Sequence, residues 1–456
     1  MMLQIEALGP DGEYRTRARG AVADAAGNPA LEISLVPGLV ASHWIDSIRD
    51  VDIPSIAETL ELLRTAADIF EREELLGDTL HAYEHRVSAL TGTPIAVIRQ
   101  CTELIAGKLR DAARAARLAR PAGSQAPDLP RHEQQREGAA WCRVGDVFAV
   151  NAAGNSPGVH SMWIEALALG YRVAVRPSTR EPLTPGRLIS ALRRAGMPGH
   201  QAIMVPTDHA AADAVIGRAD VTLLYGGQDV VDRYRNRSDI LTQGPGRSKL
   251  VVAAGADREA ALDLATEGVL YHAGTACTST TAVCVEDDPS AFADALARGM
   301  QDIEPACPWD DRARLPCMPE QDAQTLVDGV LTSVDPGAVR LAPTVRRVGS
   351  AGSMSAVTPS VIELRSPSDP LLSRELPFPC VWVAPFHRDA IESLSDSLVV
   401  AMLTDADELV SRALELPAVA NVYVGRPTSW LHPDVPHDGF LGEFLMRSKG
   451  FARDAA

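Results

Sequence analysis

Residues 144–158 read VGDVFAVNAAGNSPG, an apolar and β-branched run that ends in a segment punctuated by glycine and proline. The run at 147–150 predicts a buried strand. Gly154 and Pro157 predict a turn that leads into a helix, because proline suits the first helical position. We expect that helix to end at Gly170. Strand, turn and helix in this order are typical of the start of a β-α-β unit.

The same order continues along the chain. Three short apolar runs predict further strands, at residues 171–175, 203–205 and 221–225. Between the first two, Thr184 and Pro185 predict the start of a helix that Gly196 would close. A second series follows, with strands predicted at 250–252 and 281–285 around a helix at 257–271. This alternation predicts the α/β class, with parallel sheets covered by helices on both faces.

The first 120 residues show a different pattern. Apolar side chains recur at helical spacing around Leu63 and again around Leu109, so we expect this part to be helical. Residues 121–136 read PAGSQAPDLPRHEQQR, a polar and proline-rich segment that predicts a linker or an extended arm.

Composition excludes several classes of protein. The chain has 456 residues, with 60 acidic against 43 basic side chains and a net charge of −17, whereas a nucleic-acid binder would show basic clusters. No apolar run approaches the ~20 residues of a membrane span, and the first residues lack the apolar stretch of a signal peptide. We therefore expect a cytoplasmic protein with neither nucleic acid nor membrane as partner. Seven scattered cysteines without a C-x-x-C pair predict neither a disulfide framework nor a metal site.

Residues 154–158 fit the G-x-S-x-G pattern of a hydrolase nucleophile elbow around Ser156. The oxyanion hole of such an elbow uses the backbone N–H of the residue after the serine, and Pro157 has none. The pattern therefore favours a turn entering a helix.

Residues 271–281 read YHAGTACTSTT, which places Cys277 among small residues between a predicted helix and a predicted strand. Such a cysteine is sterically open, and nearby backbone N–H groups can lower its pKa and hold an oxyanion. A buried structural cysteine is the alternative interpretation.

Gly226 and Gly227 end a predicted strand, where either a phosphate site or a plain turn explains them.

Together these segments resemble the aldehyde dehydrogenase superfamily, in order and spacing, over about residues 140–450. Asn155 corresponds to the family's catalytic asparagine, and Cys277 follows Gln243 at the family's usual interval. Other segments similar to family motifs are Arg176-Pro177 (Lys-Pro), Gly226-Gly227 (Gly-Ser), 243–247 (Glu-Leu-Gly-Gly-Lys), 375–379 (Glu-x-Phe-Gly-Pro), 421–424 and 442–450.

The resemblance implies two Rossmann-like parallel-sheet domains and a small oligomerisation element, assembled as a homodimer or homotetramer. The implied divisions are an N-terminal helical part of the cofactor domain (1–128), a linker with oligomerisation strands (129–150), the dinucleotide-binding part (151–242), the catalytic domain (243–420) and a C-terminal oligomerisation segment (421–456).

The resemblance also implies roles for single residues. Cys277 would be the nucleophile, and the Asn155 amide would form an oxyanion hole with the Cys277 backbone N–H. Glu375 would hold the nicotinamide ribose. The implied cofactor-binding residues are Arg176, Ser178, Thr179, Gly226, Gly227, Glu375 and Pro377.

Gln243 stands where hydrolytic members carry a glutamate general base, and an amide cannot accept a proton from water at neutral pH. Relatives without that glutamate pass the acyl group to a thiol such as coenzyme A. The pattern is most similar to the acyl-thioester reductases, including the fatty acyl reductase of bacterial luminescence. We therefore expect NAD(P)H-dependent reduction of an acyl thioester, on coenzyme A or a carrier protein, to an aldehyde through a cysteine thioester.

Two alternatives stay open. One is oxidation of an aldehyde or semialdehyde, with Glu267, His272 or bulk water completing deacylation. The other is an inactive relative that serves as a binding subunit.

Two more departures concern the cofactor. Arg176 replaces a common lysine, and Thr179 replaces a glutamate that grips the adenosine ribose in many members. Loss of that carboxylate removes repulsion against a 2′-phosphate, and arginine offers a bidentate contact, which favours NADP over NAD. Thr179 is the firmer support, because this chain uses arginine almost everywhere. Pro377-Phe378 replaces the usual Phe-Gly, which alters the expected shape around the nicotinamide.

Overall fold

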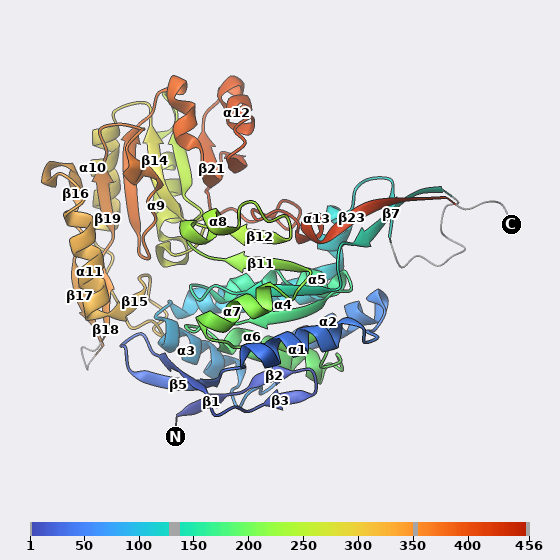
Figure 1. The fold of residues 1–456 in the computed structure, drawn as a ribbon. Helices are drawn as coiled ribbons and strands as arrows, with labels where there is room; N and C mark the ends of the chain where they lie inside the picture. Colours follow the sequence, from blue (N-terminus) through green and yellow to red (C-terminus); the bar gives the residue numbers. More distant parts are fainter. Residues whose placement is uncertain (1, 127–136, 350–353, 453–456) are drawn as a thin grey trace.

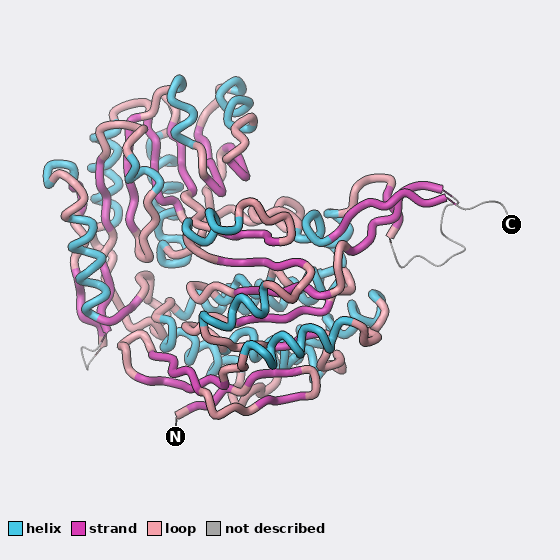
Figure 2. The backbone as a smooth tube through the Cα atoms, viewed as in Figure 1, coloured by secondary structure: helices cyan, strands magenta, loops and turns pink. Residues whose placement is uncertain are grey.

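In a computed structural model, which describes residues 2–126, 137–349 and 354–452, the chain forms two lobes that are each built on a seven-stranded sheet (Figure 1). An extended arm, which contains β7 (Glu137–Arg143) and β23 (Met446–Ala452), leaves the body on one side (Figure 1). The tube in Figure 2 shows that strands of the two sheets run at a large angle to each other.

The first sheet has the order β12-β11-β8-β9-β10-β2-β3. Strands β8 to β12 run parallel, and β2 and β3 pair antiparallel at one edge. Nearly every residue of β8 and β9 is buried, as expected for parallel strands covered on both faces. The bounds are β2 (Ala7–Gly9), β3 (Gly12–Tyr14), β8 (Val147–Asn151), β9 (Arg172–Arg176), β10 (Ala202–Met204), β11 (Val221–Tyr225) and β12 (Ile240–Gln243).

Helices cover both faces of this sheet. On one face α1 (Gly38–Arg49) and α7 (His209–Ile216) pack on Val147, Ala149 and Ala174. On the other face, Phe148, Val150 and Val173 join a larger core with several helices. Those helices are α2 (Ile56–Arg72), α3 (Leu80–Thr91), α4 (Ile95–Ala119), α5 (Ile164–Ala168) and α6 (Leu183–Arg194).

The strand order creates a crevice. From β8 the chain moves outward to β9 and β10, then crosses back to place β11 on the other side of β8. Neighbouring strands whose connections leave in opposite directions open a space beyond their carboxyl ends, where ligands of doubly wound sheets bind. Here that space lies beyond Asn151 and Tyr225.

The second sheet has the order β16-β19-β20-β14-β13-β21-β22, parallel except for β16. Its faces are covered by α9 (Arg258–Leu270) and α10 (Pro289–Met300) on one side, and by α11 (Glu320–Leu331) and α12 (Asp407–Leu414) on the other. The strands are β13 (Ser248–Val252), β14 (Thr280–Val285), β16 (Val339–Leu341), β19 (Ser360–Glu363), β20 (Cys380–Pro385), β21 (Ser397–Leu403) and β22 (Val419–Val424).

Three small sheets complete the fold. In the arm, β23 (Met446–Ala452) pairs antiparallel with β7 (Glu137–Arg143), which also pairs with β6 (Ser124–Gln125). The order β1-β5-β4 joins β1 (Leu3–Ile5), β5 (Pro29–Ser34) and β4 (Arg19–Ala23). The order β15-β18-β17 joins β15 (Cys317–Pro319), β18 (Met354–Val357) and β17 (Val345–Val348).

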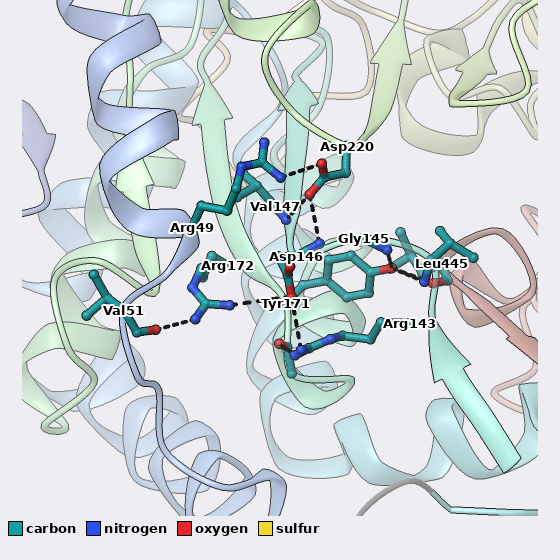
Figure 3. Close-up of polar contacts among 12 residues, drawn as sticks. Arg49, Val51, Arg143, Gly145, Asp146, Val147, Tyr171, Arg172, Asp220 and Leu445 are labelled. Atoms are coloured by element: carbon teal, nitrogen blue, oxygen red, sulfur yellow. Dashed lines mark hydrogen bonds and ion pairs between the residues drawn. The ribbon is translucent and has the colours of Figure 1, made fainter.

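A polar network ties the base of the arm to the first sheet (Figure 3). The Asp220 carboxylate accepts hydrogen bonds from the backbone N–H groups of Asp146 and Val147, at 2.8 and 2.9 Å, and pairs with the Arg49 guanidinium. The Tyr171 hydroxyl accepts from the Val144 N–H at 3.1 Å and donates to the Leu445 carbonyl.

The structure corrects several expectations. Residues 3–34 contain the strands β1 to β5, and the first helix of the described chain begins at Gly38. Residues 147–150, which the expected divisions group with the linker and oligomerisation strands, form most of β8 in the first sheet. The helix expected from Pro157 to Gly170 is a 3₁₀ turn (Pro157–Ser161) followed by the short α5. Most of the predicted linker, residues 127–136, lies outside the described residues. Within the described part, none of the helices has the length and apolar character of a membrane span.

Candidate active site

A cavity of about 1050 Å³ lies between the carboxyl edge of the first sheet and the amino edge of the second. The first lobe contributes residues that follow β8 and β11 or end β12, and the second contributes residues that precede β13, β14, β20 and β21. Six residues predicted from the sequence line it: Asn155, Gly226, Gly227, Gln243, Cys277 and Glu375.

The Cys277 loop connects α9 to β14 and is fixed by close backbone contacts. Ser248 Oγ donates a hydrogen bond to the Cys277 carbonyl at 2.9 Å. A Cβ atom on Gly246 would lie 1.8 Å from that carbonyl oxygen, so only glycine fits there. His272 and Ala273 have positive φ values of 46° and 60°, conformations that L-residues adopt at a cost. The loop is therefore held in a strained shape that presents the sulfur to the cavity.

Asn155 lies against this loop. Its Nδ2 donates a hydrogen bond to the Thr275 carbonyl at 3.2 Å, and a primary amide has a second N–H to offer. The preceding Gly154 lets the turn approach β9, because a Cβ there would lie 2.2 Å from Ser178 Oγ. The turn thus holds the Asn155 amide against the Thr275 carbonyl, in the loop that carries Cys277.

Ser156 has a structural role. Its Oγ accepts a hydrogen bond from the Gly158 N–H at 3.2 Å, which caps the 3₁₀ turn, and contacts Cys101 Sγ at 3.3 Å. The neighbouring His160 is buried and accepts a hydrogen bond from Trp163 Nε1 at Nδ1. Burial lowers the pKa of His160 to about 3. These contacts agree with the turn interpretation of the G-x-S-x-G pattern.

Gln243 ends β12 opposite Tyr225 in β11. Its carbonyl accepts a hydrogen bond from the Gly226 N–H at 3.1 Å, so the Gly-Gly turn and Gln243 form one continuous part of the cavity wall.

Glu375 precedes β20 and lies across from that wall. Its Oε1 accepts a hydrogen bond from the Arg247 N–H at 2.6 Å, while Arg247 Nη2 donates to Gln228 Oε1 at 2.8 Å. Burial raises the pKa of Glu375, and the contacts with Arg247 partly offset that rise. Pro377 is exposed and does not line the cavity, whereas Phe378 is buried in the core.

The three residues predicted on the loop after β9 differ in position. Arg176 is only 4% exposed, and its guanidinium donates to Asn151 Oδ1, to Thr207 Oγ1 and to two backbone carbonyls. Because these bonds occupy four of its five N–H groups, Arg176 has no free pair for a bidentate phosphate contact, which corrects that expectation. Ser178 is half-buried, and Thr179 is exposed.

The structure adds His437 and Asp438, which the sequence did not reveal. His437 Nε2 lies 3.8 Å from Cys277 Sγ and 3.1 Å from Asp438 Oδ2. Asn421 Nδ2, from β22, fixes this loop by donating to the His437 carbonyl at 2.7 Å. The only sequence signal is a His-Asp pair before a glycine, 160 residues from Cys277 in the chain.

Glu267 and His272, the two bases considered from the sequence, differ in their position relative to the cavity. Glu267 is exposed on α9 and does not line the cavity. His272 does line it, but its ring stacks on Tyr271 with a centroid distance of 4.2 Å, and burial lowers its pKa to about 4.

Comparison with known proteins gives distant relatives. Aldehyde dehydrogenase 1A1 of Mus musculus is 30% identical over 131 residues, which cover 27% of this chain and 26% of that protein. The mitochondrial aldehyde dehydrogenase of Leishmania tarentolae is 22% identical over 306 residues, covering 62% of this chain and 60% of that protein. The chain thus aligns with between about a quarter and three fifths of the length of these relatives.

Solved structures share the fold over the whole chain. An NAD⁺ complex of aldehyde dehydrogenase from Bacillus cereus has a TM-score of 0.80 at 17% identity, covering 98% of this chain and 96% of that one. An NADP-dependent glyceraldehyde-3-phosphate dehydrogenase from Bacillus halodurans, complexed with NADP, has a TM-score of 0.80 at 16% identity, covering 98% of each chain. The model of the aldehyde dehydrogenase family matches residues 52–442, which include both sheets' parallel strands and the whole cysteine loop. The chain therefore belongs to the aldehyde dehydrogenase family.

Proposed function

We propose that this protein is an NAD(P)-dependent oxidoreductase acting on the aldehyde group, and that it reduces an acyl thioester to an aldehyde through a thioester on Cys277. The observation that carries the proposal is the pairing of an accessible cysteine with Gln243 in one cavity. Gln243 stands where hydrolytic family members carry their general base, and its amide cannot activate water.

The residues present fit a dinucleotide. The crevice beyond β8 and β11 is where a doubly wound sheet binds one, and Gly226 and Gly227 lie at its edge. Glu375 uses Oε1 for the Arg247 N–H, so its other oxygen can accept a hydrogen bond from a ribose hydroxyl. A bound nicotinamide would supply or accept a hydride. Related structures hold NAD⁺ in one case and NADP in another, and the exposed Thr179 favours NADP here.

The chain's own groups provide the acyl chemistry. The Cys277 sulfur attacks the thioester carbonyl, and the free N–H of the Asn155 amide, with the Cys277 backbone N–H, stabilises the oxyanion that forms. Donors of this kind are worth about 3 kcal/mol each. The leaving thiol departs and the acyl group stays on Cys277, because Gln243 does not direct water at it.

Aldehyde oxidation uses the same groups in reverse and is the second candidate, favoured by the aldehyde dehydrogenases among the relatives. With Gln243 in the site, the acyl group would then pass to a thiol and give an acyl thioester. Coenzyme A and a carrier protein are both candidate thiols, and a homo-oligomer joined through the β7–β23 arm is the proposed assembly.

The test is a substrate panel in both directions. Acyl-coenzyme A substrates of several lengths are mixed with NADPH or NADH, and aldehydes with NADP⁺ or NAD⁺, with and without coenzyme A. We expect aldehyde and free thiol in equal amounts from the first set, and thiol-dependent oxidation in the second. Steady oxidation of aldehydes to acids without any thiol would overturn the proposal. Activity that survives Cys277→Ala would remove the nucleophile.

A further inference from the structure

His437 uses one ring atom for two contacts. The same Nε2 lies 3.8 Å from Cys277 Sγ and 3.1 Å from Asp438 Oδ2. The sulfur, the ring nitrogen and a carboxylate oxygen all lie within 4.8 Å of one another. This differs from a Ser-His-Asp relay, in which the carboxylate binds the ring nitrogen remote from the nucleophile.

This geometry makes Nε2 a proton donor. An ionised carboxylate only accepts hydrogen bonds, so Nε2 must carry a proton to bond with Asp438. A ring nitrogen that carries a proton has no lone pair directed at the sulfur. His437 is therefore arranged to give a proton at the site of reaction and not to take one.

We propose that His437 is a catalytic acid of this site, which gives its Nε2 proton to the thiol that leaves when Cys277 attacks an acyl thioester, while Asp438 keeps the imidazole charged. The proposal rests on the proposed function, and it adds a residue to which the sequence motifs assigned no role.

The proposed step balances without an external reactant. The Cys277 thiolate forms a bond to the acyl carbon, and the bond from that carbon to the leaving sulfur breaks. The electron pair goes to the leaving sulfur, which takes the Nε2 proton and departs as a thiol. No atom is oxidised or reduced. Because both sulfurs are bonded to one carbon in the intermediate, a donor that contacts Sγ is also within reach of the leaving sulfur.

The surroundings support a charged imidazole. Asp438 lies beside it, Cys277 and Glu375 line the same cavity, and the charge of Asp438 also acts on the hydroxyls of Tyr225 and Tyr423. Burial lowers the pKa of His437, but the hydrogen bonds and charges of Asp438 and Cys277 outweigh that effect and raise it to about 10. Burial raises the pKa of Cys277, and contact with His437 partly offsets the rise.

Release of thiol from an acyl thioester without any nicotinamide tests the acid directly. Wild type, His437→Gln and Asp438→Asn are mixed with octanoyl-coenzyme A, and the first turnover is followed by free thiol. We expect His437→Gln to slow release by about 10²-fold or more. An aryl thioester, whose thiol is a far stronger acid, should restore most of that rate, since its departure needs no proton. A structural role for His437 would slow both substrates equally and would overturn the proposal.

Controls separate this effect from misfolding. His432→Gln changes an exposed histidine of the same loop, which stacks on Trp430, and should keep the wild-type ratio between the two substrates. In Asp438→Asn the imidazole loses its carboxylate partner, which lowers its pKa. As pH rises, the rate of thiol release should therefore begin to fall at a lower pH than in wild type. An unchanged pH profile in this variant would contradict the role of Asp438.

A second measurement needs no substrate. The rate at which iodoacetamide alkylates Cys277, followed by peptide mass spectrometry across pH, reports the pKa of that thiol. Removing a positive charge beside it in His437→Gln should raise this pKa by about 1 to 3. An unchanged value would overturn the contact between His437 and Cys277. If wild type releases no thiol from any thioester while the alkylation pKa does shift, the proposed function fails and the contact stands.

Discussion

At the scale of single residues, the proposed function gives position 243 control over the lifetime of an acyl group on Cys277. Gln243 ends β12 and lines the same cavity as the sulfur, Asn155 and Glu375. Its amide is similar in size to the glutamate of hydrolytic relatives but has no basic oxygen at neutral pH. Under the proposed function, the difference between this amide and a carboxylate therefore decides whether the acyl group passes to a thiol or to water.

Gln243→Glu should add hydrolysis. A carboxylate there can take a proton from water, so release of acid from the acyl-enzyme in plain buffer should rise by about 10²-fold. The measurement is acid formed per turnover, with the thiol omitted. Gln228→Glu places the same charge elsewhere on the cavity wall and should add no hydrolysis. If both variants hydrolyse equally, position 243 has no special role.

Thr179→Glu should shift the cofactor preference toward NADH. Thr179 is exposed on the loop after β9, and a carboxylate there would repel a 2′-phosphate. Like charges in contact cost more than about 1 kcal/mol, so we expect the ratio of kcat/KM for NADPH over NADH to fall by roughly tenfold. Thr179→Ser serves as the control. An unchanged ratio in Thr179→Glu would show that this position does not face the adenosine ribose.

Single residues also show the limits of the sequence. Cys277 could be proposed from the sequence because small residues surround it between a predicted helix and a predicted strand, and the structure places it in the cavity wall. His437 could not, because only the folded chain brings it to the sulfur across 160 residues. Arg176 was expected to meet a phosphate, but the folded chain turns its guanidinium inward to Asn151 and Thr207.

At the scale of elements, the sequence predicts the strands and helices that have clear apolar runs or capping residues, and it does not predict the short strands near the N-terminus. The buried strands β9, β11, β13 and β14 and the helix α9 lie within a few residues of their predicted bounds, because each is a clear apolar run or ends at a glycine or cap. The N-terminal strands were missed, since β1, β2 and β3 have three residues each and no periodicity can show in so few. The division of the chain into domains remains a prediction.

Gly246→Ala should disrupt the cysteine loop. The added methyl would lie 1.8 Å from the Cys277 carbonyl oxygen, so the loop must move. We expect loss of most activity and a destabilisation of about 1–3 kcal/mol, measured by thermal unfolding and by alkylation of Cys277. Gly244→Ala is the matched control, because its methyl would meet only the end of the Val231 side chain. Equal effects of the two variants would contradict the importance of this backbone contact.

At the scale of the whole molecule, the carboxyl ends of first-sheet strands and the amino ends of second-sheet strands meet around the cavity. The arm is anchored near the amino ends of β8 and β9 (Figures 1 and 3). Asp220 joins α1 to the start of β8, and Tyr171, the residue before β9, binds the residue before β23. Stability of the body and placement of the arm therefore depend on one polar network.

Asp220→Asn should destabilise the fold in a pH-dependent way. Burial raises the pKa of Asp220, but the Arg49 guanidinium and two backbone N–H groups outweigh this and lower it below 3.8. A lowered pKa contributes stability above the unfolded value of about 4, and that contribution is lost as pH falls through the folded pKa. In urea, the free energy of unfolding of Asp220→Asn should thus be lower than that of wild type at pH 7. The difference between the two proteins should be smaller near pH 3. Asp213→Asn, an exposed change on α7, should match wild type at both.

Gly450→Pro should weaken assembly. Gly450 pairs with Ala139, and β23 has one neighbour, β7, among the described strands, so its other edge is open to a second copy of the chain. Proline removes a backbone donor from that strand. Sedimentation should show a shift from dimer or tetramer toward monomer with unchanged circular dichroism. An unchanged sedimentation coefficient would contradict assembly through this strand.

The most direct test of the account is the lifetime of the acyl group on Cys277. The protein is acylated with a radiolabelled octanoyl thioester, freed of small molecules, and divided between buffer alone and buffer with coenzyme A. We predict that the label stays on Cys277 in buffer and leaves rapidly as octanoyl-coenzyme A when the thiol is added. Rapid release of octanoic acid in buffer alone would contradict the account.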